Sequence, residues 1–201
     1  MLILGVNGHP DKNGSVAKMI GESLQAARDE VRHFDTRVST KVIHLVDVIK
    51  HHHNGKEESM PKWIRPTFEL MLQADGYILG TPVNWFDKSD RMHTFISYLT
   101  GLEMAGFALE GKVAAAVSHC HDDGGLMASM MMMAPMNHMG CTIPPYCLFY
   151  KNKTMADRSE VTEPALGKGW MDVDHLLVGR NVAREILKGK GFEIDNWSAR
   201  V

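Results

Sequence analysis

The sequence predicts a single α/β domain, in which helices cover both faces of a parallel sheet, over residues 1–201. Short apolar runs alternate along the chain with longer segments whose apolar residues recur at helical spacing. Three of the runs, residues 2–6, 76–80 and 112–118, are continuously apolar, as is typical of strands buried on both faces. The length of 201 residues and the hydrophobic content of 44% suit one domain with its own core.

The first half of the chain predicts three strands and two helices. The strand at 2–6 is followed by a helix from 14 or 15 to about 28, where Val16, Met19 and Ile20 share one face. A second strand is expected at 41–46 and a third at 76–80, which ends in Thr81-Pro82. A helix is then expected from 89 to 102.

The second half completes the pattern with two strands and two helices. The strand at 112–118 leads into a methionine-rich helix at 125–139. A weak fifth strand is expected at 142–148, although Pro144-Pro145 interrupts it, and a last helix at 173–188 is closed by Gly189. The polar stretches 51–62 and 151–170 are expected to be surface segments.

Charge and composition exclude several classes of partner. The net charge of −2 leaves no basic stripe for nucleic acid and no polybasic patch for a membrane surface. No apolar run reaches the ~20 residues of a spanning helix, and residues 2–6 indicate a strand and not a signal peptide. Three cysteines without ligand-like spacing, Cys120, Cys141 and Cys147, indicate reduced thiols and a cytoplasmic protein.

The segment between the first strand and the first helix is suited to an anion. A phosphate placed there meets unpaired backbone N–H groups and the positive end of the helix dipole. Gly8 and Gly14 allow close approach, while Lys12, Asn13 and Ser15 offer a charge, an amide and a hydroxyl. The spacing matches neither the nucleotide-triphosphatase loop nor the dinucleotide fingerprint. The alternative is a tight turn with a serine cap that binds nothing.

Two further loops are expected at the same edge of the sheet, because ligands of doubly wound sheets bind beyond the carboxyl ends of the strands. One is Thr81 to Phe86, with backbone groups for a heterocycle and two aromatic side chains. The other is Ser118 to Gly125, which enters the methionine-rich helix through two glycines. The alternatives are a proline-initiated turn with Trp85 in the core, and a solvated connection.

Metal binding is the weaker interpretation of the histidine-rich segments. His51, His52 and His53 are adjacent on a polar stretch, which favours plain surface polarity. His119 to Asp122 crowd four potential ligands into one loop, where they cannot easily converge on one ion. The successive methionines at 130–133 point all round a helix, which favours packing or a subunit interface.

At these loops the sequence resembles the NADPH-dependent FMN reductase and NAD(P)H:quinone oxidoreductase family, whose fold is flavodoxin-like. Family members begin with a strand followed by Gly-Ser-Pro-Arg-x-x-Gly/Ser-Asn-Thr/Ser, and here residues 8–15 read Gly-His-Pro-Asp-Lys-Asn-Gly-Ser. A Thr-Pro turn before a Ser-x-x-Met helix matches 81–85 and 89–95, and a Gly-Lys-Val-x-Ala strand matches 111–115. The family's glycine-rich loop matches Gly124 and Gly125. The resemblance covers about residues 2–150.

The resemblance implies a five-stranded parallel sheet in the order 2-1-3-4-5, bound FMN, and NADPH or NADH as co-substrate. Hydride would pass through the flavin to a small acceptor such as a quinone, a flavin, or a nitro or azo compound, and no side-chain catalyst would be needed. A homodimer or a dimer-based tetramer is also implied. The expected cofactor-binding residues are His9, Lys12, Asn13, Gly14, Ser15, Val16, Pro82, Val83, Asn84, Trp85, Phe86, Ser118, His119, Gly124 and Gly125.

The chain departs from the family pattern in the phosphate loop itself. His9 stands where a serine is usual, and Asp11 stands where an arginine is common. A carboxylate beside a phosphate is unfavourable unless it points away or is offset by Lys12 and His9. These departures keep open a flavin-free binding or regulatory protein. A flavodoxin-type electron carrier is a second alternative, for which a net charge of −2 is weak support.

Overall fold

The computed structural model describes residues 1–51, 61–154, 162–163, 168–194 and 197. Five parallel strands form the main sheet in the order β2-β1-β3-β5-β6, and a short strand, β4, pairs antiparallel with the end of β3. Counting the parallel strands alone, this is the expected order 2-1-3-4-5 of a flavodoxin-like fold. The strands are β1 (Leu2–Asn7), β2 (Ser39–His44), β3 (Gly76–Asn84), β4 (Asp87–Lys88), β5 (Val113–Cys120) and β6 (Leu148–Asn152).

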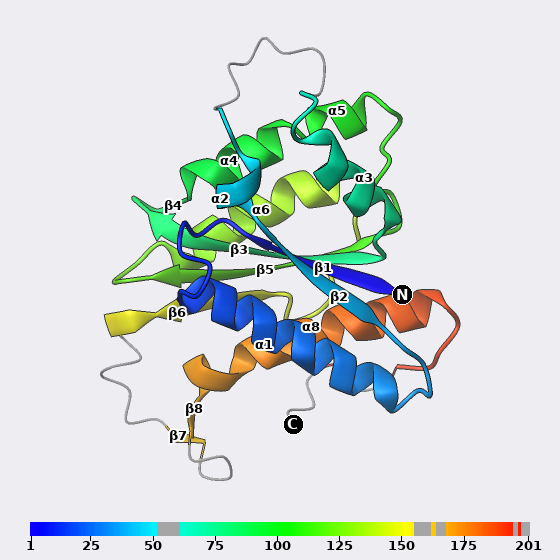
Figure 1. The fold of residues 1–201 in the computed structure, drawn as a ribbon. Coiled ribbons are helices and arrows are strands. Elements are labelled where there is room, and N and C mark those ends of the chain that lie inside the picture. Colours follow the sequence, from blue (N-terminus) through cyan, green and yellow to red (C-terminus); the bar gives the residue numbers. More distant parts are fainter. Residues whose placement is uncertain (52–60, 155–161, 164–167, 195–196, 198–201) are drawn as a thin grey trace.

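Helices cover both faces of this sheet (Figure 1). One face carries α1 (Ser15–Arg32) and α8 (Trp170–Gly189). The other face carries α2 (Leu45–Val48), α3 (Arg65–Gln73), α4 (Asp90–Ser97), α5 (Thr100–Glu103) and α6 (Gly125–His138). A separate two-stranded sheet joins β7 (Thr162–Glu163) to β8 (Lys168–Gly169).

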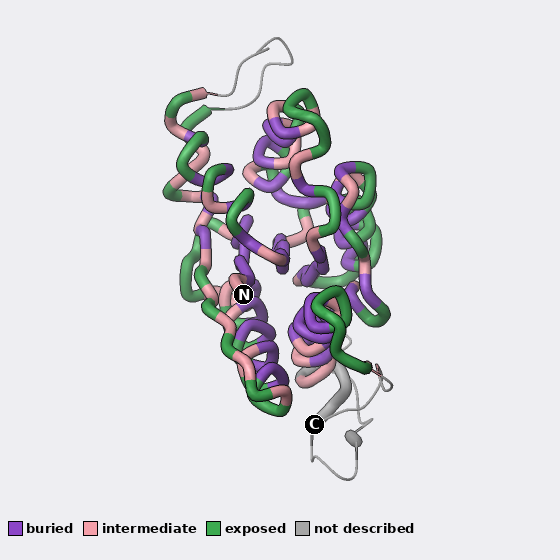
Figure 2. Tube along the Cα trace, turned by 90° about the vertical axis from the view of Figure 1, so that its right-hand side faces the viewer, coloured by how far each residue is buried: buried purple, intermediate pink, exposed green. Residues whose placement is uncertain are grey.

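The sheet divides the core into two layers, because successive strand residues point to opposite faces. Ile3 and Ile78 belong to the cluster with α1 and α8, while their neighbours Leu4 and Leu79 belong to the cluster with α3, α4 and α6. In Figure 2 the buried positions, in purple, follow the strands and the helix sides that face them. The expected burial of the central strands on both faces is confirmed, since residues 3–7 and 76–81 are all buried.

Several element boundaries differ from the expected ones. The fifth parallel strand begins at Leu148 and not at 142, because Pro144 and Pro145 lack the N–H groups that could donate to β5 in a ladder. Thr142 makes only an isolated bridge to Val113. The helix expected at 89–102 ends at Ser97, and α5 follows it as a separate turn. The structure also contains a helix that was not expected, α3, over Arg65–Gln73.

The last helix packs closely against the first. A Cβ on Gly179 would lie 1.8 Å from the carbonyl oxygen of Ser23, so only glycine allows this approach. The carboxylate of Glu30 accepts hydrogen bonds from Arg180 at 2.9 Å and from Arg184 at 2.8 Å, and the three side chains are largely buried. The first and last helices are thereby joined on one face of the sheet.

Two other expectations concern the cysteines and membrane-spanning helices. Cys120, Cys141 and Cys147 are all buried free thiols. Among the described helices, none has the length and apolar character needed to cross a bilayer.

Candidate functional site

Asn7, the last residue of β1, organises the loop that follows it. Its buried side chain accepts the N–H of His9 through Oδ1 at 3.0 Å, and its Nδ2 lies 3.0 Å from Nδ1 of His44. The N–H of Gly8 donates to the carbonyl of Gly80 at 2.7 Å, which ties the loop to β3. A Cβ on Gly8 would lie 3.1 Å from that same carbonyl oxygen, so the tie favours glycine.

The middle of this loop is closed by its own side chains. Nδ1 of His9 accepts the N–H of Asp11 at 2.9 Å, and the Asp11 carboxylate accepts the N–H of Asn13 at 2.8 Å. Nζ of Lys12 lies 2.6 Å from Oδ2 of Asp47 on α2, and this hydrogen bond lowers the pKa of Asp47. The structure therefore pairs Lys12 with a carboxylate and does not bring its ammonium to the start of α1.

The amino end of α1 keeps its backbone donors free. Gly14 is the N-cap, and in the described part of the chain no side chain caps this helix. The N–H groups of residues 15–17 have no helical acceptor, as at any helix start. The Val16 side chain is fully buried in the core, so that residue can offer only its N–H group. The helix end thus retains the partial positive charge that attracts an anion.

His119 brings the end of β5 to this helix end. Its Nδ1 lies 3.0 Å from Oγ of Ser15, although the two residues are 104 positions apart. In the sheet register it lies between Pro82 of β3 and Lys151 of β6. Burial lowers the pKa of His119, and the nearby positive charge of Lys151 and the His9 ring lower it further. The imidazole is therefore mainly neutral near pH 7 in the free protein.

The second expected loop is a β-hairpin. The prediction of a loop from Thr81 is wrong, because β3 continues to Asn84 and turns back into β4. The turn residues Trp85 and Phe86 have φ of 48° and 67°, the double positive φ of a type I′ hairpin turn. Such angles are costly for bulky residues and are often found at functional sites. Trp85 is 95% exposed and so does not enter the core.

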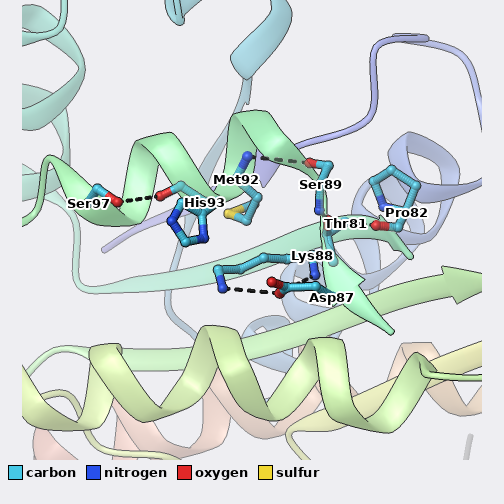
Figure 3. Close-up of polar contacts among 8 residues, drawn as sticks. All are labelled: Thr81, Pro82, Asp87, Lys88, Ser89, Met92, His93 and Ser97. Atoms are coloured by element: carbon cyan, nitrogen blue, oxygen red, sulfur yellow. Dashed lines mark hydrogen bonds and ion pairs between the residues drawn. The ribbon is translucent and has the colours of Figure 1, made fainter. Parts of the chain in front are cut away.

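Ser89 links this hairpin to the first loop, and Figure 3 shows it beside Thr81 and Met92. Its N–H donates to Oγ1 of Thr81 at 2.8 Å, and its own hydroxyl donates to the carbonyl of Gly8 at 2.9 Å. Oγ also accepts the N–H of Met92 at 3.3 Å and so caps α4. The sequence pattern identified Ser89 only as a helix start, because its bond to Gly8 spans 81 residues and has no local signal.

The third loop begins after Cys120 and not at Ser118 as expected, because β5 continues to Cys120, and close contacts shape it. Gly124 has φ of +82°, and a Cβ there would lie 2.7 Å from Cα of Phe86, in the hairpin. A Cβ on Gly125 would lie 2.7 Å from Cβ of Tyr150. Ser118 is fully buried, and its hydroxyl donates to the carbonyl of Gly125 at 2.8 Å. The Ser118 side chain is therefore committed to holding the loop.

The three expected segments do meet at the carboxyl edge of the sheet. Ser15, Gly14 and His9 lie with His119 at the start of α1, and Gly124 packs on the hairpin turn. The expected residues Pro82 and Val83 are half-buried within β3, and Asn84 and Asn13 are exposed. The side chains of Lys12, Val16 and Ser118 are engaged elsewhere in the fold.

Other parts of the described chain offer weaker sites. No three histidine, cysteine or carboxylate side chains gather as a metal site among the described residues, and His52 and His53 lie outside them. A hollow of about 380 Å³ at the opposite edge of the sheet is lined by Asp75, Lys112 and Lys190. Asp75 already binds the N–H of Leu2 and Lys190, and Lys112 binds backbone carbonyls. The carboxyl edge is therefore the stronger candidate.

The comparison with known families identifies the family of this chain. The profile of the NADPH-dependent FMN reductases matches residues 1–155. The chain belongs to that family. It is accordingly a flavin-dependent oxidoreductase that uses FMN, with NAD(P)H as co-substrate. A search of curated protein sequences finds no match to the chain.

Solved structures agree with this family member in fold. An oxidoreductase from Corynebacterium diphtheriae has a TM-score of 0.73 at 13% identity, covering 93% of this chain and 97% of that one. RosB with bound 8-demethyl-8-formylriboflavin-5'-phosphate has a TM-score of 0.70 at 14% identity, covering 94% and 80%. An apo NADH:FMN oxidoreductase has a TM-score of 0.63 at 18% identity, covering 93% and 89%. At these identities the likeness shows the fold.

The residues of this reductase fit FMN. The uncapped start of α1, the Ser15 hydroxyl and the His119 imidazole suit the phosphate, and the exposed hairpin aromatics offer faces for the ring. The unfavourable group is the Asp11 carboxylate. Because it binds the N–H of Asn13, that carboxylate is held within its own loop.

Proposed function

We propose that this reductase passes electrons from NADPH or NADH, through FMN, to a small organic acceptor of the quinone, flavin, nitro or azo class. Structures of similar fold include an azoreductase from Bacillus anthracis, with a TM-score of 0.55, and a flavone reductase, with a TM-score of 0.67, of which this chain covers 66%. The name of the azoreductase supports the azo class of acceptor, and the name of the flavone reductase supports a small organic acceptor in general. When bound, FMN supplies the redox chemistry.

The protein's own residues bind and orient. The N–H groups of residues 15–17, the Ser15 hydroxyl and His119 would hold the phosphate, and Asn84 would bind the polar edge of the ring. Trp85 and Phe86 would stack on the ring or line the acceptor pocket. The observation that carries this proposal is the uncapped start of α1, where Ser15 contacts His119. The same edge of the sheet carries the hairpin with its exposed aromatic side chains.

The experiment is reduction of the reconstituted protein without oxygen. The purified chain should be yellow or take up added FMN, and NADPH or NADH should bleach it. Adding a quinone or an azo dye should then restore the yellow colour and consume the acceptor. A protein that takes up no FMN, or a yellow protein that neither nicotinamide bleaches, would contradict the proposal, and the second result would favour an electron carrier.

We further propose that the protein is a cytoplasmic homodimer, or a tetramer built from such dimers. The buried free thiols support a reducing compartment. One set of exposed apolar side chains lies on the hairpin turn and the neighbouring α6, and we call it the hairpin–α6 patch. It consists of Trp85, Phe86, Leu126, Met127, Met130 and Met131. Such a patch is typical of a surface that a second subunit covers.

A further inference from the structure

The hydrogen bond between Ser15 and His119 can run in either direction. When Nδ1 of His119 carries no proton, the Ser15 hydroxyl donates to it across their 3.0 Å separation. That hydroxyl then has no proton left to donate to an anion at the start of α1. When Nδ1 carries a proton, it donates to Oγ of Ser15 instead, and the Ser15 hydroxyl is free to turn toward the anion. A proton on Nδ1 thus decides whether Ser15 can act as a phosphate donor. The neutral tautomer with its proton on Nδ1 would also free the hydroxyl, but only the doubly protonated ring adds a positive charge opposite the phosphate.

The surroundings of His119 keep it neutral until an anion arrives. The titratable groups that face it are His9 of the first loop, His121 just beyond its own strand, Lys151 of β6, and Lys153. All of them disfavour a further positive charge, and burial does so more strongly. From β3 the neighbour in register is the uncharged Pro82. A phosphate dianion at the start of α1 would oppose these effects.

We propose that the FMN phosphate is bound together with one proton from solvent, which His119 holds on Nδ1 while Ser15 donates to the phosphate. The only bond that forms is N–H on the imidazole, and no group is oxidised or reduced. This inference rests on the proposed FMN function. It makes His119 a residue that selects phosphorylated flavin over riboflavin, and the selection strengthens as the pH falls, by up to about tenfold per pH unit.

The test counts protons by titration calorimetry. FMN is added to the flavin-free full chain at about pH 7.5, where the flavin phosphate, with a second pKa of about 6, is almost entirely dianionic. Repeating the titration in two buffers of different ionisation enthalpy gives the number of protons taken up. We expect about one proton per FMN for the wild type and none for His119→Asn, whose amide can still donate to Ser15 but does not titrate.

A matched variant separates this histidine from its neighbour. His121 lies two residues further on, is 71% exposed and pairs with Asp122 at 3.1 Å. His121→Asn should therefore retain the wild-type proton count. Riboflavin, which lacks the phosphate, should bind without proton uptake in every variant.

The outcomes distinguish the inference from the function on which it rests. FMN binding by the wild type without proton uptake, or equal uptake by His119→Asn, would overturn the inference and leave the cofactor in place. A wild type that binds no FMN at any pH would overturn the proposed function. If His119→Asn does not fold, nitrogen NMR of the wild type decides: the His119 ring should be protonated at about pH 7.5 with FMN and neutral without it. A neutral ring in both states would overturn the inference.

Discussion

Two polar side chains expected at the phosphate differ in what they can still bind. The Ser15 hydroxyl lies at an uncapped helix start, whereas the Lys12 ammonium already contacts Asp47. A hydrogen bond to a charged group contributes about 1.5–3 kcal/mol. Ser15→Ala should therefore weaken FMN binding by roughly ten- to a hundredfold, and Lys12→Ala should weaken it less. Quenching of flavin fluorescence on binding measures both.

Riboflavin and a distant serine supply the controls. Riboflavin affinity should be the same in the wild type and in Ser15→Ala, because the change affects only the phosphate. Ser97 donates its hydroxyl to the carbonyl of His93 on α4, so Ser97→Ala should bind FMN as the wild type does. Unchanged FMN affinity in Ser15→Ala would remove Ser15 from the site.

The sequence could predict the positions of residues whose contacts are with near neighbours along the chain. Ser15 follows a glycine at a strand–helix junction, so its place at the helix start was evident from its neighbours. The partners of Lys12 and Ser89 were not evident, because Asp47 and Gly8 lie 35 and 81 residues away along the chain. These contacts depend on the order of the sheet, which places β2 and β3 on either side of β1.

At the scale of elements, the contact between the third loop and the hairpin can be tested at Gly124. Alanine there must adopt a φ of +82° and place its Cβ 2.7 Å from Cα of Phe86. Gly124→Ala should lower the free energy of unfolding by about 1–3 kcal/mol, and it should also weaken flavin binding by shifting the hairpin. Denaturant unfolding and flavin titration measure the two effects.

Gly21 provides the matched control for this substitution. It lies within α1, and nothing lies within 4 Å of a Cβ built on it. Gly21→Ala should raise the free energy of unfolding by about 0.5–1 kcal/mol, because alanine is the better helix former. If both variants changed stability in the same direction, the steric argument at Gly124 would fail.

The hairpin is an element that the sequence pattern could not predict. Type I′ turns are predicted from Asn-Gly or Asp-Gly pairs, and Trp85-Phe86 carries no such signal. Thr81-Pro82 also suggests a turn, since proline cannot donate to a sheet ladder. The buried central strands were predictable because continuous apolar runs require cover on both faces, whereas this strained turn depends on its neighbours.

At the scale of the molecule, the ion cluster between α1 and α8 should make stability depend on pH. Burial alone would raise the pKa of Glu30, but hydrogen bonds from Arg184 and Arg180 outweigh it and lower that pKa. Because the pKa of Glu30 is lower in the folded than in the unfolded protein, its carboxylate stabilises the fold at pH values above the unfolded-state pKa of about 4.3. This stabilisation is lost as the pH falls through the folded-state pKa. Glu30→Gln should cost about 3 kcal/mol near pH 7, and the difference should shrink below about pH 4.

Asp29 tests whether any carboxylate on α1 would behave in this way. It pairs with Arg32 at 2.9 Å on the surface, and its side chain is 49% exposed. Asp29→Asn should change the free energy of unfolding by less than about 1 kcal/mol at either pH. Urea unfolding at both pH values measures the two variants, and a pH-independent effect of Glu30→Gln would contradict the assigned role.

The proposed dimer is a second property of the whole molecule. Met130 lies in the hairpin–α6 patch at 54% exposure, so Met130→Glu should place a charge in the interface and shift the protein to monomers. Met104 is 82% exposed outside that patch, so Met104→Glu should leave the mass unchanged. Light scattering at micromolar concentration measures the mass, and a monomeric wild type would contradict the dimer.

The packing of α8 on α1 also affects how the chain can fold during synthesis. The family profile ends at residue 155, yet Val178 and Val182 of α8 help to cover the sheet face that holds Ile3 and Ile78. At roughly 5–20 residues per second, the ribosome delivers Gly179 on the order of ten seconds after Ser23, its contact in α1. During that interval α1 is the only one of the two helices that can cover this apolar face of the nascent sheet. The part of this face that α8 covers in the folded protein therefore stays exposed, and prone to aggregation, until the last helix has been made.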